Sequence, residues 1–304
     1  MPVFPIQEVD ETKSPLNPGC GKLVEHCCHK GGVWVGRATP KLGLLHQSAI
    51  LGAMSSNPSS GYLLCGSPRS GSTLLCDLLA RSRVAGVPGS YFRPASIPDF
   101  VKEWGLSVSR QGWDRSYVDA VRRHGERGTG CFGMRIMWSD MPAFVDRLGS
   151  LFPDVSGVRE LLRSALGIEH FVRLSRDDKV AQAVSLVMAA QTGLWHRNAD
   201  GSVREGSEPV EPALYDHKLI ASELRMLEVE ERGWTSWFAS ESIEPLELTY
   251  ETLSSEPVET TRLVLGYVGA RAVNVPSVGT ARLATSLNKD WAERFNAELS
   301  SSLK

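Results

Sequence analysis

The sequence lacks long uninterrupted apolar runs, and this absence excludes a membrane-spanning helix of ordinary length. Its apolar stretches are short and broken by charged residues, whereas a span needs about 20 consecutive apolar residues. The chain also lacks a strong charge of either sign, with a net charge of −2 and a pI near 6.4. Because this balance gives no overall attraction to nucleic acid or to a membrane surface, any anion binding must be local.

Cysteine is scarce as well, and the few cysteines form no regular framework. They stand at positions 20, 27, 28, 65, 76 and 131, without the even spacing of disulfide-stapled secreted domains. Cys65 and Cys76 fall within a predicted strand and helix, where buried reduced thiols are expected, and this favours a cytoplasmic protein. No properly spaced second cysteine pair follows the cluster between Cys20 and His29, so we expect no bound metal.

Residues 1–60 contain no sustained helical or strand period and are rich in Gly, Pro, Ser and Lys. We predict a loosely ordered extension there, followed by one α/β domain over residues 61–304. The length of 304 residues and the hydrophobic content of 42% are enough for one large core. The extension has no basic region followed by an apolar one, so it does not resemble a signal peptide.

The most informative stretch is LLCGSPRSGSTLLCDLL, from Leu63 to Leu79. Its apolar run, glycine-punctuated turn and helical apolar pattern predict a strand, a loop and a helix. The first N–H groups of a helix have no intrahelical partner, so a phosphate or sulfate binds there. Glycines let the backbone approach an anion, while an arginine and hydroxyls donate to it. These residues are Gly66, Gly71, Arg69, Ser70, Ser72 and Thr73. We call the segment from Gly66 to Thr73 the cradle.

The spacing of Gly66, Gly71 and Thr73 is that of a nucleotide-binding P-loop, with one departure. Ser72 stands where an ATPase or GTPase carries lysine. Because that lysine bridges the β and γ phosphates, transfer of a γ-phosphate is disfavoured. A nucleotide with a shorter or differently charged tail is favoured instead. Two alternatives stay open: a P-loop sugar or nucleotide kinase that uses Mg²⁺ and ATP, and a non-catalytic nucleotide-binding protein.

Two later segments carry candidate residues for catalysis and for the acceptor. The loop of residues 84–96 is predicted to lie at the mouth of the nucleotide site, where acceptor groups are often supplied. A buried strand is predicted from Cys131 to Met137. A charge within such a strand is costly unless it faces an anion or a partner, so Arg135 is a candidate for charge stabilisation. The candidate acceptor contacts are Tyr91, Arg93 and Trp138.

A second strand-to-helix junction is predicted around Arg176. The strand runs from His170 to Ser175, and Asp177 or Asp178 opens the helix. Ser185 lies nine residues beyond Arg176, about 13 Å along a regular helix. Both residues therefore reach one anion only if the chain between them is irregular or if Arg176 extends back over the helix.

The remaining segments are assigned from their apolar periods and turn residues. We predict a helical region over 99–126, a polar loop over 196–211, a helix over 214–232, a strand over 243–250, a helix over 256–268 and a terminal helix after Asn288 and Lys289.

Several motifs, taken in order, resemble the family of bacterial sulfotransferases typified by trehalose 2-sulfotransferase. They are CGSPRSGSTLL, VAGVPGSYF, GMRIMW, RDDKVAQAVSL, QTGLW, GWTSWF, LTYETL and LNKDWAERF, and the resemblance covers about residues 61–299. It implies a P-loop-like sulfotransferase fold of the α/β class, with a central parallel sheet flanked by helices. It also implies 3′-phosphoadenosine-5′-phosphosulfate as the donor, a sugar hydroxyl as the small-molecule acceptor, and a homodimer.

The resemblance also implies roles for individual residues. Arg69 to Thr73 match the loop that holds the 5′-phosphosulfate, and Arg176 and Ser185 match the 3′-phosphate motif. The segment around Asn288 and Lys289 is similar to the one that closes over the nucleotide. No metal is expected in the reaction.

One departure from the family concerns the catalytic base. Ser90 stands at the position of the family's proposed base, a glutamate, and Arg135 stands where the typified member has lysine. Serine is a poor base at neutral pH unless another group activates it. The base is therefore unassigned, and the candidates from other segments are Asp140, Glu103 and His196.

Overall fold

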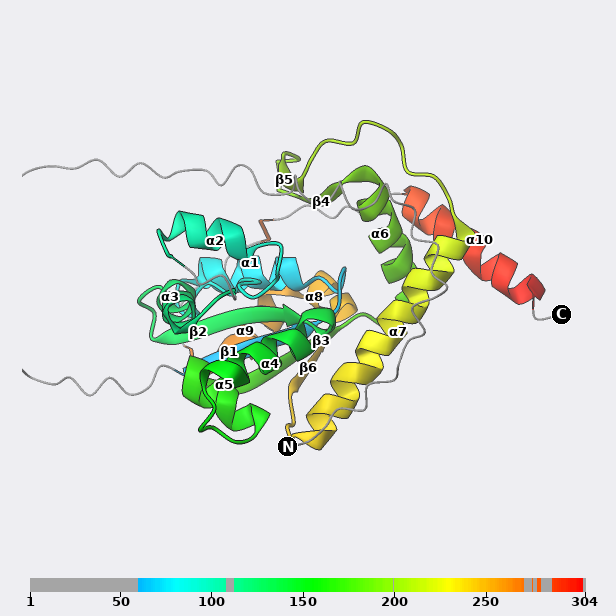
Figure 1. The fold of residues 1–304 in the computed structure, drawn as a ribbon. Coiled ribbons are helices and arrows are strands. Elements are labelled where there is room, and N and C mark those ends of the chain that lie inside the picture. Colours follow the sequence, from blue (N-terminus) through cyan, green and yellow to red (C-terminus); the bar gives the residue numbers. More distant parts are fainter. Residues whose placement is uncertain are drawn as a thin grey trace, which may run out of the picture.

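A computed structural model describes residues 60–107, 112–198, 200–270, 275, 278–279 and 286–302. Apart from its last residue, the predicted extension over 1–60 lies outside the described residues. In the described part, a four-stranded sheet has the order β2-β1-β3-β6 and is parallel throughout. The sheet is flanked by helices (Figure 1), which confirms the predicted fold class. Its strands are β1 (Ser60–Gly66), β2 (Cys131–Met137), β3 (Ile168–Ser175) and β6 (Leu246–Thr249).

The apolar residues of the central strand β1 are buried because helices cover both faces of the sheet. All but the first of its residues are buried, as expected for a parallel strand within an α/β domain. In register, Gly66 of β1 pairs with Met137 of β2 and with Leu174 of β3, and Ser175 pairs with Thr249 of β6. The carboxyl ends of the four strands therefore meet at one edge, and the cradle begins there.

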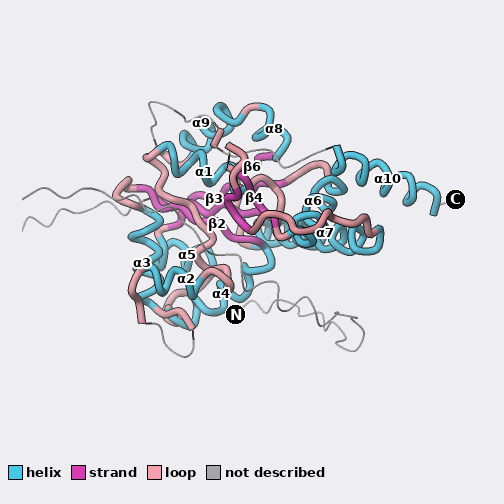
Figure 2. The backbone as a smooth tube through the Cα atoms, turned by 90° about the horizontal axis from the view of Figure 1, so that it is seen from above, coloured by secondary structure: helices cyan, strands magenta, loops and turns pink. Residues whose placement is uncertain are grey.

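The helices form two layers and a lateral group (Figure 2). One face of the sheet is covered by α1, α8 and α9, and the other by α2, α3, α4 and α5, while α6, α7 and α10 lie to one side. In chain order they are α1 (Ser72–Ser82), α2 (Ile97–Glu103), α3 (Arg115–Glu126), η3 (Trp138–Asp140), α4 (Met141–Leu151), α5 (Val158–Leu166), α6 (Lys179–Thr192), α7 (His217–Ser240), α8 (Tyr250–Ser255), α9 (Pro257–Tyr267) and α10 (Ser286–Ser302). Among the described residues, no helix is long and apolar enough to cross a membrane.

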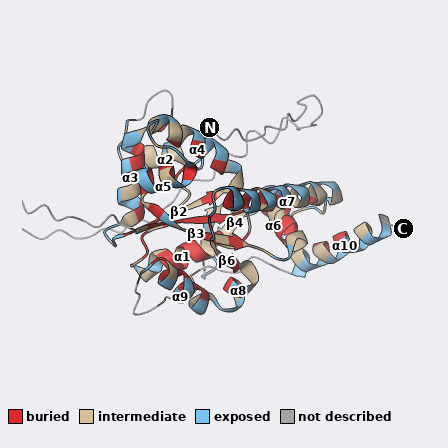
Figure 3. Cartoon of the chain, turned by 90° about the horizontal axis from the view of Figure 1, so that it is seen from below, coloured by how far each residue is buried: buried red, intermediate tan, exposed pale blue. Residues whose placement is uncertain are grey.

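The core follows these groups of helices. One buried cluster lies under α3, α4 and α5 and includes the aromatic end of α7, and another lies under α1 and α9. A further cluster joins α6, α7 and α10 through Phe295 and Trp291. In Figure 3 the buried residues line the inner faces of the helices, and much of α10 is exposed or only half-buried. The attachment of α10 therefore depends on a few aromatic side chains.

Several sequence predictions of secondary structure need correction. The segment 99–126 is not one helical region, because Gly105 and Gly112 adopt positive φ angles of 64° and 99° and separate α2 from α3. The long helix continues past residue 232 to Ser240, because Trp234 and Trp237 are buried within it rather than after it. The strand predicted over 243–250 is shorter, and Tyr250 begins α8.

The largest correction concerns the segment that was predicted to be a polar loop. It contains an antiparallel hairpin of β4 (Leu194–Arg197) and β5 (Val203–Gly206). The pair Asp200-Gly201 lies between the strands, and Gly201 has a φ of 85°. Asp-Gly is a strong hairpin signal. The prediction of a loop gave more weight to the polar residues of the segment than to this signal.

Replacement of Phe295 by alanine tests the attachment of α10. The ring is fully buried in the cluster of α6, α7 and α10, and a buried Phe→Ala change costs about 3–5 kcal/mol. We expect the free energy of unfolding in urea to fall by that order and amide exchange in α10 to accelerate. Leu287→Ala on the same helix is the control, because this side chain is exposed. Equal effects of the two changes would show that α10 is not held by Phe295.

Candidate anion-binding site

The cradle presents the uncapped amino terminus of α1 at the carboxyl edge of the sheet. Its N-cap, Gly71, has a φ of 87° and no side-chain capping bond, whereas Asp178 caps α6 by accepting from Ala181 N–H. The hydroxyl oxygen of Ser70 is buried and has no hydrogen-bond partner among the described residues. Unsatisfied donors at a helix amino terminus bind anions. The cradle therefore has the local structure of an anion site.

Glycine is required at position 71 for two reasons. Its backbone is left-handed, which disfavours side chains, and a Cβ there would lie 2.7 Å from the ring of Tyr250. The same ring faces the guanidinium of Arg176, 4.5 Å from its centroid. Tyr250, the first residue of α8, thus contacts both the cradle loop and a cation of the site.

Arg69 links the two distant residues of the predicted 3′-phosphate motif. Arg69 Nε donates to Ser185 Oγ at 3.0 Å, and Arg176 Nη1 donates to the carbonyl oxygen of Arg69 at 3.4 Å. The separation along α6 that the sequence implied is therefore bridged by the cradle, which lies between them. Arg69 has a φ of 63°, a left-handed conformation that is unfavourable for a residue with a Cβ. In this conformation its guanidinium reaches Ser185 on α6.

The site concentrates positive charge. Burial, and then the nearby Arg176, lower the pKa of Arg69 to about 10, so Arg69 still carries its charge at neutral pH. Arg135 donates to Ser90 Oγ at 2.8 Å, to Thr73 Oγ1 at 2.8 Å and to Ser72 Oγ at 3.3 Å. Within the described residues, the side chains of Arg69 and Arg135 donate hydrogen bonds to hydroxyl and carbonyl oxygens, not to carboxylates. The charge of Glu205 acts on Arg69 in the opposite sense, and an anion in the cradle would add further negative charge.

Ser90 lies beside Arg135 because the loop after α1 pairs with β2. Gly89 forms a parallel bridge with Met134, and the backbone N–H of Arg135 donates to the Gly89 carbonyl at 2.9 Å. The position expected for the base therefore does lie in the site. Its hydroxyl, however, accepts a hydrogen bond from a guanidinium and is no base by itself.

The β4–β5 hairpin lies across the cradle and was not predicted to do so. Nη1 of Arg69 donates to the Trp195 carbonyl at 2.6 Å, and His196 Nε2 lies 3.0 Å from Thr73 Oγ1. From β5, Arg204 pairs with Asp77 of α1 at 2.8 Å. These contacts place β4 over the start of α1 and bring His196, one of the three candidate bases, to the site.

Two further side chains support the cradle from behind. Trp234 Nε1–H donates to the Gly66 carbonyl at 3.0 Å, and the amide of Gln182 donates to Ser67 Oγ at 2.9 Å and to the Pro68 carbonyl at 2.7 Å. Sequence reasoning missed both. Gln182 carries no motif, and the indole of Trp234 resembles that of any core tryptophan until the fold shows where its N–H points.

The structure separates the three candidate acceptor contacts. Tyr91 is only 4% exposed, its ring packs on Phe100, and its hydroxyl donates to the Val87 carbonyl. Tyr91 therefore serves in packing, and the structure does not favour it as an acceptor contact. Arg93 is exposed and lies 3.7 Å from Glu205 of the hairpin. Arg93 remains a candidate acceptor contact.

Trp138 packs against the core, and the terminal segment begins a helix. The ring of Trp138 meets the edge of Trp234 and is partly buried. Asn288 and Lys289 lie in the first turn of α10, not before the helix as predicted. Lys289 is exposed and pairs with Glu293 at 3.6 Å. The roles assigned to Asn288 and Lys289 by resemblance stay predictions.

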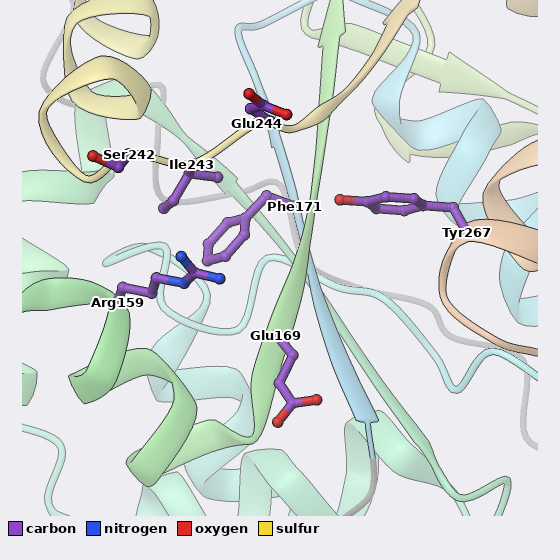
Figure 4. Close-up of a pocket in the computed structure, with 7 residues that line it drawn as sticks. All are labelled: Arg159, Glu169, Phe171, Ser242, Ile243, Glu244 and Tyr267. Carbon is purple, nitrogen blue, oxygen red and sulfur yellow. The ribbon is translucent and has the colours of Figure 1, made fainter.

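A surface pocket lies away from this site, at the end of the sheet where β3 and β6 begin (Figure 4). It is lined by Arg159, Glu169, Phe171, Ser242, Ile243, Glu244 and Tyr267. In open α/β sheets ligands bind outside the carboxyl ends of the strands, so we do not assign this pocket to the active site. Within the described residues, no group of His, Cys, Asp and Glu side chains could hold a metal ion.

The fold and the arginine-lined cradle define a class: an α/β protein whose central strand leads through a P-loop-like turn to a helix amino terminus that is suited to an anion. The model of the Stf0 sulphotransferase family matches residues 61–298. The chain belongs to this family and is a sulfotransferase, which requires a sulfonate donor as co-substrate; the family predicted from the motifs is thus confirmed.

Two relatives have established names. Trehalose 2-sulfotransferase of Mycolicibacterium smegmatis is 31% identical over 271 residues, which cover 81% of this chain and 97% of that protein. Trehalose 2-sulfotransferase of Mycobacterium tuberculosis is 29% identical over 259 residues, which cover 78% of this chain and 94% of that protein.

A buried carboxyl group on α7 makes stability depend on pH. Glu230 is 7% exposed, and burial, followed by the charges of Glu231 and Asp140, raises its pKa to about 7. A raised pKa means that the contribution of Glu230 to stability is complete below pH 4.5 and is lost as the pH rises through 7.

Asp140, another candidate base, has its pKa raised by burial, and Arg93 opposes that shift.

Glu230→Gln should therefore stabilise the protein more at pH 8 than at pH 5. The gain at pH 8 should be about 1–3 kcal/mol, since glutamine stays neutral where the buried glutamate ionises. Urea unfolding at the two pH values measures it. Glu228→Gln, at an exposed position of the same helix, should show no such pH dependence. A pH-independent difference between Glu230→Gln and the wild type would contradict the assigned pKa.

Proposed function

We propose that the enzyme transfers a sulfuryl group from 3′-phosphoadenosine-5′-phosphosulfate to a hydroxyl of a carbohydrate acceptor. The observation that carries this proposal is the presence of three arginines at the cradle, whose helix amino terminus is uncapped: Arg69 belongs to it, Arg135 donates to Thr73, and Arg176 donates to the Arg69 carbonyl. Ser72 in place of the P-loop lysine favours this donor over ATP. The names of the two relatives support a trehalose-like sugar as the acceptor.

The cradle fits the donor's two charged ends. The first-turn N–H groups of α1, the orphan hydroxyl of Ser70 and the guanidinium of Arg69 suit a 5′-phosphosulfate. Arg176 and Ser185, which both contact Arg69, suit a 3′-phosphate. Asn288 and Lys289, at the start of α10, are proposed to approach the nucleotide. The donor supplies the sulfuryl group and a stable leaving bisphosphate.

The residues of the site act mainly through position and charge. Arg135 donates to Ser72 and Thr73 and so lies beside the first turn of α1, where the leaving phosphate would sit. Arg69 and Arg135 stabilise negative charge that grows on the bridging and sulfuryl oxygens, and they are already oriented before reaction. The cradle holds the donor in line with the acceptor hydroxyl, which removes much of the entropic cost of the encounter.

We also propose that the enzyme is cytoplasmic and acts as a homodimer. The cysteines within the described residues, Cys65, Cys76 and Cys131, are buried free thiols, and burial raises the pKa of each. Such thiols suit a reducing compartment. The homodimer is proposed from the family resemblance.

Arg69→Ala tests the reaction. Transfer of labelled sulfuryl from the donor to trehalose, or to another sugar of a panel, should fall about 10²–10³-fold. The backbone should tolerate the change, because arginine and alanine both carry a Cβ. Arg262→Ala, at an exposed position of α9, is the control and should keep full activity. Mg²⁺-dependent phosphate transfer from ATP in the wild type would instead identify a kinase.

Arg176→Ala tests the proposed 3′-phosphate site. Loss of a charge-assisted contact should weaken adenosine 3′,5′-bisphosphate by about 10–100-fold, whereas adenosine 5′-monophosphate should bind as it does to the wild type. Titration calorimetry of both ligands measures the difference. Equal weakening of both would mean that Arg176 supports the cradle and does not read the 3′-phosphate.

A further inference from the structure

The site needs a general base that position 90 does not supply. Ser90 Oγ accepts from Arg135 Nε at 2.8 Å, and a serine hydroxyl does not take a proton at neutral pH without an activating base. We propose that His196, on β4, is the general base that accepts the proton of the acceptor hydroxyl. This inference rests on the proposed function and adds the residue that completes it.

Hydrogen bonds connect His196 to the position of the family's base. Arg135 joins Ser90 to Thr73, because its Nε donates to Ser90 and its Nη1 donates to Thr73 Oγ1. His196 Nε2 lies 3.0 Å from that same oxygen. Since Thr73 Oγ1 already accepts from Arg135, its own hydrogen is free to point to Nε2. The contact is compatible with a neutral ring whose lone pair is on Nε2, the form that a base requires, and the proposal takes this tautomer.

The surroundings of His196 keep the ring unprotonated and respond to an anion. Burial, followed by the charges of Arg69, Arg135 and Arg204, lowers the pKa of His196 to about 3. Glu205 on β5 is the facing carboxylate, with Oε2 3.6 Å from Nε2. An anionic donor beside Arg69 and Arg135 would offset their repulsion and raise the proton affinity of the ring. The base then becomes stronger when the donor is bound.

The other candidate bases are less well placed. Glu103 is exposed at the end of α2, where its charge acts on His124 and Tyr91. Asp140 is on η3, where the charge of Arg93 acts on it and its own charge acts on Glu230. Within the part of the chain that the structure describes, neither carboxylate forms a hydrogen bond or an ion pair with the cradle. Glu205 pairs with His196 and Arg93 and its charge acts on Arg69, and in this scheme its carboxylate stabilises the imidazolium.

The step balances in atoms and charge. The acceptor oxygen forms a bond to sulfur as its proton passes to His196 Nε2, and the acceptor replaces Thr73 as the partner of that nitrogen. The bond between sulfur and the bridging phosphate oxygen breaks, and its electron pair leaves with adenosine 3′,5′-bisphosphate. Arg69 and Arg135 face the growing negative charge, and Glu205 faces the new positive charge on His196. The proton later leaves to solvent through the side of the hairpin on which Glu205 is partly exposed.

Titration of the histidine rings by ¹⁵N NMR tests the assignment without turnover. His196→Gln identifies the signal. We expect a neutral ring in the free protein down to about pH 4, and a pKa that rises by about one pH unit or more when adenosine 3′,5′-bisphosphate is added. An imidazole that is charged at pH 7 in the free protein, or a pKa that the ligand does not change, would overturn the proposal.

Chemical rescue tests the catalytic role. With phosphoadenosine phosphosulfate and a sugar that the wild type sulfates, His196→Ala should lower kcat about 10²–10⁴-fold, while calorimetry should show adenosine 3′,5′-bisphosphate still bound. Added imidazole should restore part of kcat, which would not follow from a structural role. His124→Gln is the control, because His124 stacks on Trp104 in another part of the fold.

Two other outcomes would reject the assignment in different ways. If His196→Ala keeps its kcat and Glu205→Gln loses it, the base is Glu205 and the inference is wrong while the proposed function stands. If the wild type transfers no sulfuryl group to any sugar of the panel, the proposed function fails and the inference fails with it.

Discussion

Repulsion among cations at the carboxyl edge of one parallel sheet is the constraint on which the site depends. Arg69, Arg135 and Arg176 come from a loop, a strand and a strand-to-helix junction, and the parallel register places all three at the same edge. Their hydrogen bonds hold them on neutral oxygens and a tyrosine ring. The charge of Glu205 offsets part of this repulsion at Arg69, and an anion in the cradle would offset it further.

The rest of the structure positions these charges. Trp234 and Gln182, from α7 and α6, hold the first half of the cradle through its carbonyl and hydroxyl oxygens. The β4–β5 hairpin covers the second half and is tied to it at Trp195 and His196. A transferase needs such a cover, because water that reaches the sulfuryl group would compete with the acceptor.

The pair of Ser90 and Arg135 illustrates how a site changes within one family. A glutamate beside a lysine can act as base and charge partner, whereas a serine beside an arginine makes a fixed hydrogen bond. The arginine then extends to Thr73 and so to His196. If His196 is the base, as proposed, the proton acceptor of this chain lies on the hairpin and not in the loop after α1.

The sequence by itself determined the local features. The glycines, the arginine and the hydroxyls of the cradle, the strand-helix order around it and the family follow from residue type and spacing, because a helix amino terminus and a tight turn depend on neighbours in the chain. Tertiary structure alone decided which distant groups meet. It placed Arg69 between Arg176 and Ser185, which spacing along α6 had seemed to separate, and it buried Tyr91. It also brought His196 to Thr73, since the register of a hairpin against another segment is set by packing and not by local pattern.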